Sequence, residues 1–254
     1  MSSNSEEKEV WHQDDHFWKA FYPILFDEKR WAAAQGEIDG ATSLLDISPP
    51  ARICDLCCGP GRHSLELARR GFSVTAVDRT ILHLKRAKEK ADSEGLSIEF
   101  VEEDMRCFCR PASYDAIINL WSSFGYFEDP EDDRKVLLNI YRSLAKGGKL
   151  LMDLMGKEVL ARVFRERDWH EEDGTIMMEE RKVNRDWSWI ENRWILLKGE
   201  TRKEFKVAHR LYSANELSSL LKECGFRSVN VYGNFEGEPY DHKAQRLVVV
   251  VEKG

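Results

Sequence analysis

The chain has 254 residues, of which 42% are hydrophobic, and it contains eight Trp and twelve Phe. This apolar content is sufficient for a large core and excludes a wholly disordered chain. The net charge of −7 argues against a nucleic-acid binder, and the longest apolar run, residues 247–251, is too short to span a bilayer. The first twenty residues hold no signal-peptide core, so we expect a cytoplasmic protein with no membrane partner.

The N-terminal part of the chain is rich in aromatic residues. Residues 11–22 (WHQDDHFWKAFY) place aromatic side chains four apart, which predicts a short amphipathic helix that ends near Pro23. The apolar spacing over residues 27–45 predicts a second helix before Pro49 and Pro50. We interpret residues 1–48 as a tail followed by a helical lid.

From residue 52 onward the pattern alternates between strands and helices. Strands are predicted at 53–56, 73–77, 98–101, 114–120 and 149–154. Helices are predicted at 65–70, 81–91 and 131–145. Repeated strand–helix units indicate a parallel sheet with right-handed crossovers.

The alternation breaks at residues 157–212, where three apolar segments favour strands and Asn184 marks a turn. A helix at 214–224 and strands at 228–232 and 246–252 then complete the sheet, and the short loop between the last two strands makes them antiparallel. The fold prediction is therefore α/β, with a seven-stranded mixed, mostly parallel sheet. Residues 49–156 and 213–254 form its main domain, and residues 157–212 form an antiparallel β insertion over the active site.

The most informative motif covers residues 53–64 (ICDLCCGPGRHS), where a strand enters a glycine turn that opens a helix. Such a turn lets the backbone approach a ligand closely, and the helix N-terminus favours an anionic group. Asp78 ends the next strand, where a carboxylate accepts hydrogen bonds from ribose hydroxyls. A nicotinamide-dependent Rossmann oxidoreductase has the same arrangement, so this class stays open on these features alone.

Three details distinguish this motif from a dinucleotide site. Ser64 stands where the third glycine of G-x-G-x-x-G is expected. Asp55 lies just before the turn, where it repels a pyrophosphate and tolerates a ligand ammonium group. A further acid, Asp104, ends the third strand within residues 102–106 (EEDMR), where it is placed to accept from an adenine amino group.

Residues 55–61 (DLCCGPG) resemble the first motif of the class I S-adenosylmethionine (SAM)-dependent methyltransferases, with Cys57 in place of the first glycine. Residues 144–151 (LAKGGKLL) resemble the motif that precedes the fifth strand of that family. The resemblance covers residues 50–155 strongly and 213–252 more loosely, and it implies SAM as the cofactor. The residues that we expect at the cofactor are Asp55, Cys57, Gly59, Gly61, Arg62, Asp78, Arg79, Asp104, Met105, Leu120 and Trp121, with Trp18 and Tyr22 from the lid.

Acceptor-binding residues are predicted at the carboxyl edge of the sheet, where ligands bind in open α/β folds. In the methyltransferases that act on exocyclic base amines or glutamine amides, the segment that begins here with Asn119 reads Asn-Pro-Pro-Tyr or similar. In this chain Leu, Trp and Ser follow Asn119, so the resemblance disfavours those acceptors. Alternation along residues 187–197 places Trp187 and Arg193 on one face with Trp189, Glu191, Ile195 and Leu197. The expected acceptor contacts are Phe124, Tyr126, Trp187, Arg193, Arg210, Tyr240 and His242. His16 and Tyr126 are the candidate catalytic residues, with His16 as a proton acceptor in the lid.

These features predict SAM-dependent methyl transfer to a nitrogen or oxygen of a small-molecule acceptor. The donor is already activated, so positioning and desolvation supply most of the acceleration. A nicotinamide-dependent oxidoreductase and a regulatory protein that holds SAM without transferring it are the two alternatives.

The six cysteines include a C-x-x-C at Cys54 and Cys57 and a C-x-C at Cys107 and Cys109. Cys54 lies in an apolar strand and Cys57 in the glycine turn, so we expect reduced structural thiols and no metal. Elemental analysis should therefore find no stoichiometric zinc or iron, and chelators should leave activity unchanged. One zinc per chain that is lost together with activity would make these four cysteines the ligands.

Overall fold

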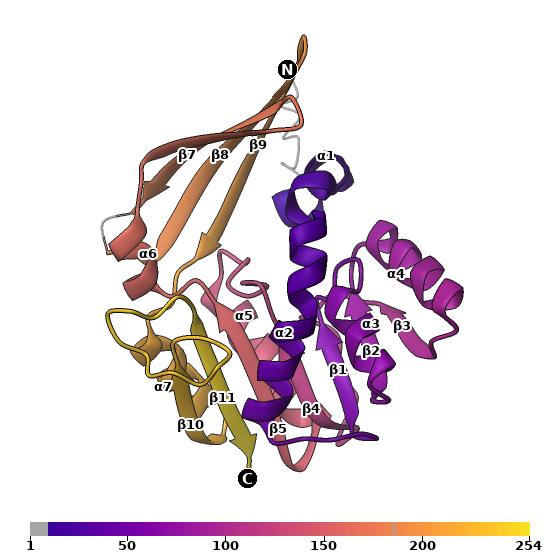
Figure 1. Ribbon diagram of the computed structural model, residues 1–254. Helices are drawn as coiled ribbons and strands as arrows, with labels where there is room; N and C mark the ends of the chain where they lie inside the picture. Colours follow the sequence, from indigo (N-terminus) through magenta and orange to yellow (C-terminus); the bar gives the residue numbers. More distant parts are fainter. Residues whose placement is uncertain (1–9, 185) are drawn as a thin grey trace, which may run out of the picture.

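The computed structural model describes residues 10–184 and 186–254, which form two β-sheets and the helices that cover them (Figure 1). The large sheet contains β1 (Arg52–Leu56), β2 (Ser73–Asp78), β3 (Ile98–Glu102), β4 (Tyr114–Asn119), β5 (Leu144–Leu154), β10 (Phe226–Tyr232) and β11 (Leu247–Lys253). The small sheet contains β6 (Arg167–Glu172), β7 (Thr175–Val183), β8 (Trp189–Lys198) and β9 (Thr201–Arg210). The helices are the 3₁₀ turn η1 (Trp11–Gln13), α1 (Asp15–Leu25), α2 (Glu28–Leu45), α3 (Arg62–Arg69), α4 (Ile81–Glu94), α5 (Pro130–Ser143), α6 (Lys157–Val163) and α7 (Ala214–Glu223).

The large sheet has the strand order β10-β11-β5-β4-β1-β2-β3. Strands β1 to β5 pair in parallel, whereas β11 runs antiparallel to both β5 and β10. The predicted mixed seven-stranded sheet with an antiparallel end is therefore confirmed. Because β1 to β4 are parallel, the segments that follow Leu56, Asp78, Glu102 and Asn119 leave the sheet at the same edge.

Helices cover both faces of the large sheet. Residues of α2 and α3, such as Ile38 and Leu67, pack on one face together with Ile53 and Ile118, and α4 adds Leu84 against Ala76. Residues of α5 and α7, such as Val136 and Leu217, pack on the opposite face. None of the helices in the described part of the chain is long and apolar enough to cross a membrane.

The small antiparallel sheet lies beyond the carboxyl edge of the large sheet, and α1 lies beside it (Figure 1). The side chains of Phe17 and Phe21 of α1 are fully buried in a separate core with Met177, Leu196 and Val207 of the small sheet. The indole N–H of Trp11 also donates to the carbonyl oxygen of Ala208 at 2.7 Å. We call η1, α1 and β6 to β9 together the cap.

The structure departs from the sequence prediction mainly in residues 11–25 and 157–172. Helix α1 continues through Pro23 to Leu25, although a proline removes one helical hydrogen bond, because burial of Phe17 and Phe21 stabilises the helix. Helix α6 and strand β6 were not predicted, because most residues of 157–172 are charged or exposed and show no apolar period.

Gly125 joins the base of the cap to the loop after β4. It has a φ of +85°, and its carbonyl oxygen accepts the N–H of Arg210, the last residue of β9, at 2.6 Å. A Cβ at this position would lie 2.7 Å from the carbonyl oxygen of Arg210. Gly125→Ala should therefore lower the free energy of unfolding by about 2 kcal/mol or more in a urea titration.

Gly36 provides the matched control, because it lies inside α2 and a Cβ there would meet no atom within 4 Å. Gly36→Ala should raise the free energy of unfolding by about 0.5–1 kcal/mol. Similar effects of the two substitutions would contradict the close approach at Gly125.

Candidate active site

A cavity of about 250 Å³ opens at the carboxyl ends of β1 to β4. The large sheet supplies one side, from Asp55, Asp78, Asp104 and Trp121, and the cap supplies the other. The cap residues that line it come from η1, α1, β8 and β9. The cavity is therefore shared between the two sheets.

The turn between β1 and α3 forms the floor of the cavity. Cys57, Gly59 and Gly61 all have positive φ, of 64°, 55° and 83°. Asp55, at the end of β1, is buried and accepts the hydroxyl of Ser64 at 2.6 Å. Burial raises the pKa of the Asp55 carboxyl, and this hydrogen bond acts in the opposite direction.

Asp78 is held by two backbone donors, one in the turn after β1 and one just after β2. One carboxylate oxygen accepts the N–H of Gly59 at 2.8 Å, and the other accepts the N–H of Thr80 at 2.8 Å. Each oxygen of an ionised carboxylate has capacity for a further hydrogen bond, and Asp78 lines the cavity. The side chain is therefore fixed in position and can still accept from a ligand.

Asp104 and Met105 reach the cavity from the end of β3. Asp104 accepts two hydrogen bonds from the guanidinium of Arg106, at 3.1 and 2.8 Å. Burial alone would raise its pKa, but the hydrogen bonds and charge of Arg106 lower it, so the carboxylate is ionised. The sulfur of Met105 lies 3.6 Å from the sulfur of Cys57, which joins the ends of β1 and β3.

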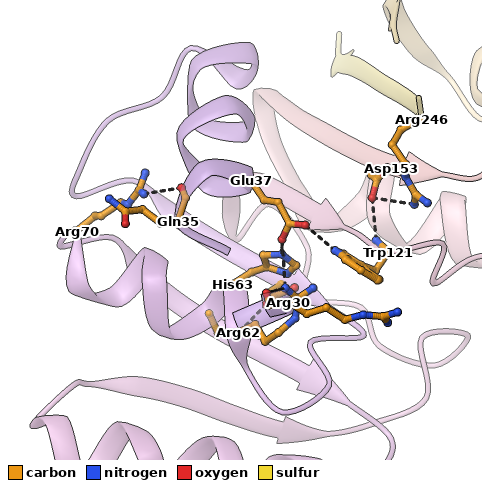
Figure 2. A network of polar contacts seen from close by, with 11 residues as sticks. Arg30, Gln35, Glu37, Arg62, His63, Arg70, Trp121, Asp153 and Arg246 are labelled. Atoms are coloured by element: carbon orange, nitrogen blue, oxygen red, sulfur yellow. Dashed lines mark hydrogen bonds and ion pairs between the residues drawn. The ribbon is translucent and has the colours of Figure 1, made fainter. Parts of the chain in front are cut away.

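A half-buried carboxylate, Glu37 of α2, joins α2 to α3 and to the loop after β4 (Figure 2). It accepts from His63 at 2.7 Å, from the indole of Trp121 at 2.9 Å and from Arg62 at 3.3 Å. Burial would raise the pKa of Glu37, yet the hydrogen bond and charge of His63, together with Arg62 and Trp121, lower it to about 2. The guanidinium carbons of Arg30 and Arg62 each lie 4.8 Å from the ring centre of Trp121.

The loop after β4 is held in an unusual backbone conformation. Trp121 and Ser122 have φ values of 60° and 58°. The N–H of Trp121 donates to the carboxylate of Asp153 at 3.1 Å, and Arg246 pairs with the same carboxylate at 2.6 Å (Figure 2). A left-handed backbone conformation is energetically costly for residues other than glycine, and such residues cluster at functional sites.

Two histidines, His12 and His209, line the cavity from the cap. His12 of η1 stacks on Tyr126 with ring centres 5.6 Å apart. Burial, followed by the charges of Arg79 and Arg106, lowers the pKa of His12 to about 4. Burial alone lowers the pKa of His209 of β9 to about 4.

Most of the predicted cofactor residues meet at the cavity. The structure places there Asp55, Cys57, Gly59, Arg62, Asp78, Arg79, Asp104, Met105, Leu120, Trp121 and Trp18. Gly61 lies behind the turn, where a Cβ would approach Ala87 of α4 to 2.8 Å. Tyr22 lies outside the cavity, with the guanidinium of Arg86 3.6 Å from its ring centre.

Of the predicted acceptor and catalytic residues, the structure brings only Tyr126 to the cavity. His16 is exposed on α1, while His12, one helical turn earlier, lines the cavity. Phe124 is buried against Tyr212 in the main core. Periodicity alone could not distinguish the two histidines, because the 3₁₀ turn before α1 was not predicted.

The remaining predicted contacts point elsewhere. Trp187 packs on Phe164, and Arg193 pairs with Glu180 and Glu204 on the face of the small sheet opposite Trp194. Arg210 pairs with buried Asp133. Tyr240 donates to Glu158 at 2.9 Å, and the carbonyl oxygen of exposed His242 accepts from Arg162. Sequence analysis missed His12, Arg30, Glu37, His83, Trp194, Val207 and His209, which line or support the cavity.

The cysteines of the described residues are free thiols. Burial raises the pKa of Cys54 and Cys58. Over residues 10–184 and 186–254, no group of three or more His, Cys, Asp or Glu side chains is arranged to hold a metal ion.

Comparisons with known proteins agree with this geometry. Residues 53–148 match the model of a family described as a methyltransferase domain. The glycine/sarcosine N-methyltransferase of Halorhodospira halochloris is 27% identical over 262 residues, covering 95% of this chain and 90% of that protein.

Two solved structures show the same fold. A SAM-dependent methyltransferase from Clostridium acetobutylicum matches with a TM-score of 0.78 and 18% identity, over 94% of this chain and 98% of that one. CalS10, an amino pentose methyltransferase from Micromonospora echinaspora solved with SAM bound, matches with a TM-score of 0.65 and 19% identity, over 93% and 96% of the two chains. The glycine turn, the acids at the strand ends and these matches agree on one assignment: the chain is a class I SAM-dependent methyltransferase, with SAM as its methyl donor.

Proposed function

We propose that this methyltransferase transfers the methyl group of SAM to a nitrogen or oxygen of a small molecule, with an amine nitrogen as the preferred acceptor. The observation that carries the proposal is the single cavity that joins the acids of the large sheet to the imidazole-bearing cap. The relative from Halorhodospira is named for methylation of glycine and sarcosine nitrogen, and CalS10 for an amino pentose. These names support an amine as the acceptor.

The cofactor placement that we propose follows the strand ends. Asp78 accepts the two ribose hydroxyls, and Asp104 with Met105 borders the adenine. The methionine end lies toward Leu120 and Trp121. Backbone of the glycine turn approaches the cofactor closely at Gly59, while Gly61 acts indirectly by allowing α3 to pack on α4.

In this arrangement the acceptor approaches the sulfonium from the cap side. An in-line displacement forms the bond from nitrogen to the methyl carbon and breaks the bond from carbon to sulfur, leaving S-adenosylhomocysteine. The nitrogen must carry a free electron pair, so it binds uncharged or loses its proton before attack. A cavity enclosed by aromatic rings disfavours an ammonium ion through desolvation, so the amine binds uncharged. His12 and His209, with pKa values lowered to about 4, stay neutral and can accept hydrogen bonds from the acceptor.

We further propose a division of labour along the chain. Residues 49–156 and 213–254 bind the cofactor, and the lid within residues 1–48 closes over it together with the insertion at 157–212. Residues 1–9 of that N-terminal segment lie outside the described residues. Phe17 and Phe21 are buried against the small sheet, so the N-terminal lid and the insertion act as one cap. Exclusion of water by this cap strengthens electrostatic interactions at the reacting atoms.

The buried histidines predict how stability depends on pH. An unfolded His12 takes up a proton as the pH falls below about 6.5, whereas the folded one resists protonation down to about 4. The parent should therefore lose stability as the pH falls from 6.5 toward 4. In His12→Gln the loss should be smaller, by on the order of 1–2 kcal/mol at pH 5, measured by urea titration at several pH values.

Asp133 acts in the opposite direction, because burial raises its pKa to about 6 despite the Tyr212 hydrogen bond, but it is present in both proteins and cancels in the comparison. Parallel pH profiles for the parent and His12→Gln would contradict a neutral buried His12.

Asp78 provides the test of the cofactor site. Loss of two charge-assisted hydrogen bonds should cost about 2–4 kcal/mol, or about 30- to 1000-fold in affinity. Calorimetric titration of Asp78→Ala with S-adenosylhomocysteine measures this directly. Asp115→Ala is the control, because Asp115 pairs with Arg52 at the opposite edge of the sheet and should leave the affinity unchanged. Unchanged affinity in Asp78→Ala would remove Asp78 from the cofactor site.

A further inference from the structure

The cap end of the cavity contains a hydrogen-bond donor that the protein does not use. Four tryptophans line the cavity, and three of their indole N–H groups have partners: Trp11 donates to Ala208, Trp18 to His12 and Trp121 to Glu37. The N–H of Trp194 is buried and has no partner among the described residues. Buried donors are nearly always paired in folded proteins, and the N–H of Trp194 lies at the cavity, so it is available to a bound molecule.

Two histidines also line the cap part of the cavity, and their ring nitrogens, unlike the N–H of Trp194, are not among the buried polar atoms without a partner. In the part of the chain that the structure describes, the ring nitrogens of His12 and His209 form no hydrogen bonds, although both rings line the cavity. His209 opposes Ile190 in the small sheet, and Trp194 follows Ile190 by four residues, so His209 and Trp194 share one face. Trp11 brings η1, and with it His12, against β9.

The charged groups of the cavity lie away from Trp194 and His209, whereas Arg79 lies next to His12. The carboxylates that line the cavity are Asp55, Asp78, Glu103 and Asp104, all at the ends of β1 to β3. Three arginines also line it: Arg62 pairs with Glu37, Arg30 lies over Trp121, and Arg79 donates to the carbonyl oxygen of His12. Among the described residues, none of the three forms a hydrogen bond, ion pair or cation–π contact with Trp194 or His209.

A second ionised group on the acceptor would therefore be buried at this end without a partner of opposite charge, which is costly. Hydroxyl groups suit the site better. The indole N–H of Trp194 can donate to a hydroxyl oxygen, and a neutral imidazole can accept from a hydroxyl or an amine N–H. The rings of Trp194, Trp11 and Tyr126 offer apolar faces to the carbon skeleton.

We infer that Trp194 and His209 form an acceptor subsite for a hydroxylated amine that carries no second ionised group. The inference rests on the proposed function and specifies its substrate class. It favours an amine of the amino-sugar type over a carboxylated amine of the glycine type. Trp194 binds an acceptor oxygen, and the imidazole of His209 binds a polar hydrogen.

The test uses the full chain, SAM and three amine probes: D-glucosamine, glycine and sarcosine. Formation of S-adenosylhomocysteine and the methylated amine is followed by mass spectrometry. Trp194→Phe keeps an aromatic ring and removes the N–H group. It should raise the KM for D-glucosamine about tenfold or more and leave the affinity for S-adenosylhomocysteine unchanged. Trp189→Phe is the control, because Trp189 is on the same strand and outside the cavity, and it should change neither quantity.

Methyl transfer to D-glucosamine in preference to glycine and sarcosine, with the selective rise in KM, supports the subsite. Preference for glycine or sarcosine, or an unchanged KM in Trp194→Phe, would overturn it. Transfer to none of the three amines by a parent that binds S-adenosylhomocysteine would overturn it as well. Failure of the parent to bind S-adenosylhomocysteine would instead overturn the proposed function.

Discussion

The shape of the cavity depends most on the hydrogen bonds that the Glu37 carboxylate accepts from His63, Trp121 and Arg62. Glu37 lies on α2, outside the glycine turn, yet it holds His63 at the start of α3 and the indole of Trp121 after β4. Partial burial would raise the pKa of Glu37, but His63, Arg62 and Trp121 lower it to about 2, so the carboxylate stays charged. A neutral side chain here would leave Arg62 buried without its counter-charge, at a cost of several kcal/mol. The N-terminal helices are thus part of the site as well as its cover.

The two sheets contribute different chemistry to one cavity. The large sheet brings acids to its carboxyl edge, and they are held by a hydroxyl donor at Asp55, by backbone donors at Asp78 and by guanidinium donors at Asp104. The cap brings aromatic rings and uncharged imidazoles, with its own core around Phe17 and Phe21. We propose that this separation suits methyl transfer: charge is available where the cofactor is recognised, and an apolar, dry surface faces the reacting atoms. Variation of the cap would change the acceptor while the cofactor end is kept.

The sequence predicted the large sheet well because strand and helix periods alternate there and the strand ends fix the ligand edge. It predicted the insertion only as antiparallel strands. Along 187–197 both alternating faces carry Trp, Ile and Leu, so the pattern could not show that Trp194, rather than Arg193, faces the cavity. His12 and Glu37 were missed for a related reason. Their roles depend on contacts with β9 and with Trp121, 84 residues beyond Glu37, and local periodicity carries no record of such contacts.

A crystal structure with S-adenosylhomocysteine bound tests the central claim most directly, because the claim concerns where each end of the cofactor lies. The account predicts ribose hydroxyls on Asp78, adenine beside Asp104 and the amino-acid end beside Trp121. It also predicts that the thioether sulfur faces the cap wall formed by Trp194 and His209. A cofactor bound with its sulfur directed away from that wall, or with the ribose away from Asp78, would contradict the account.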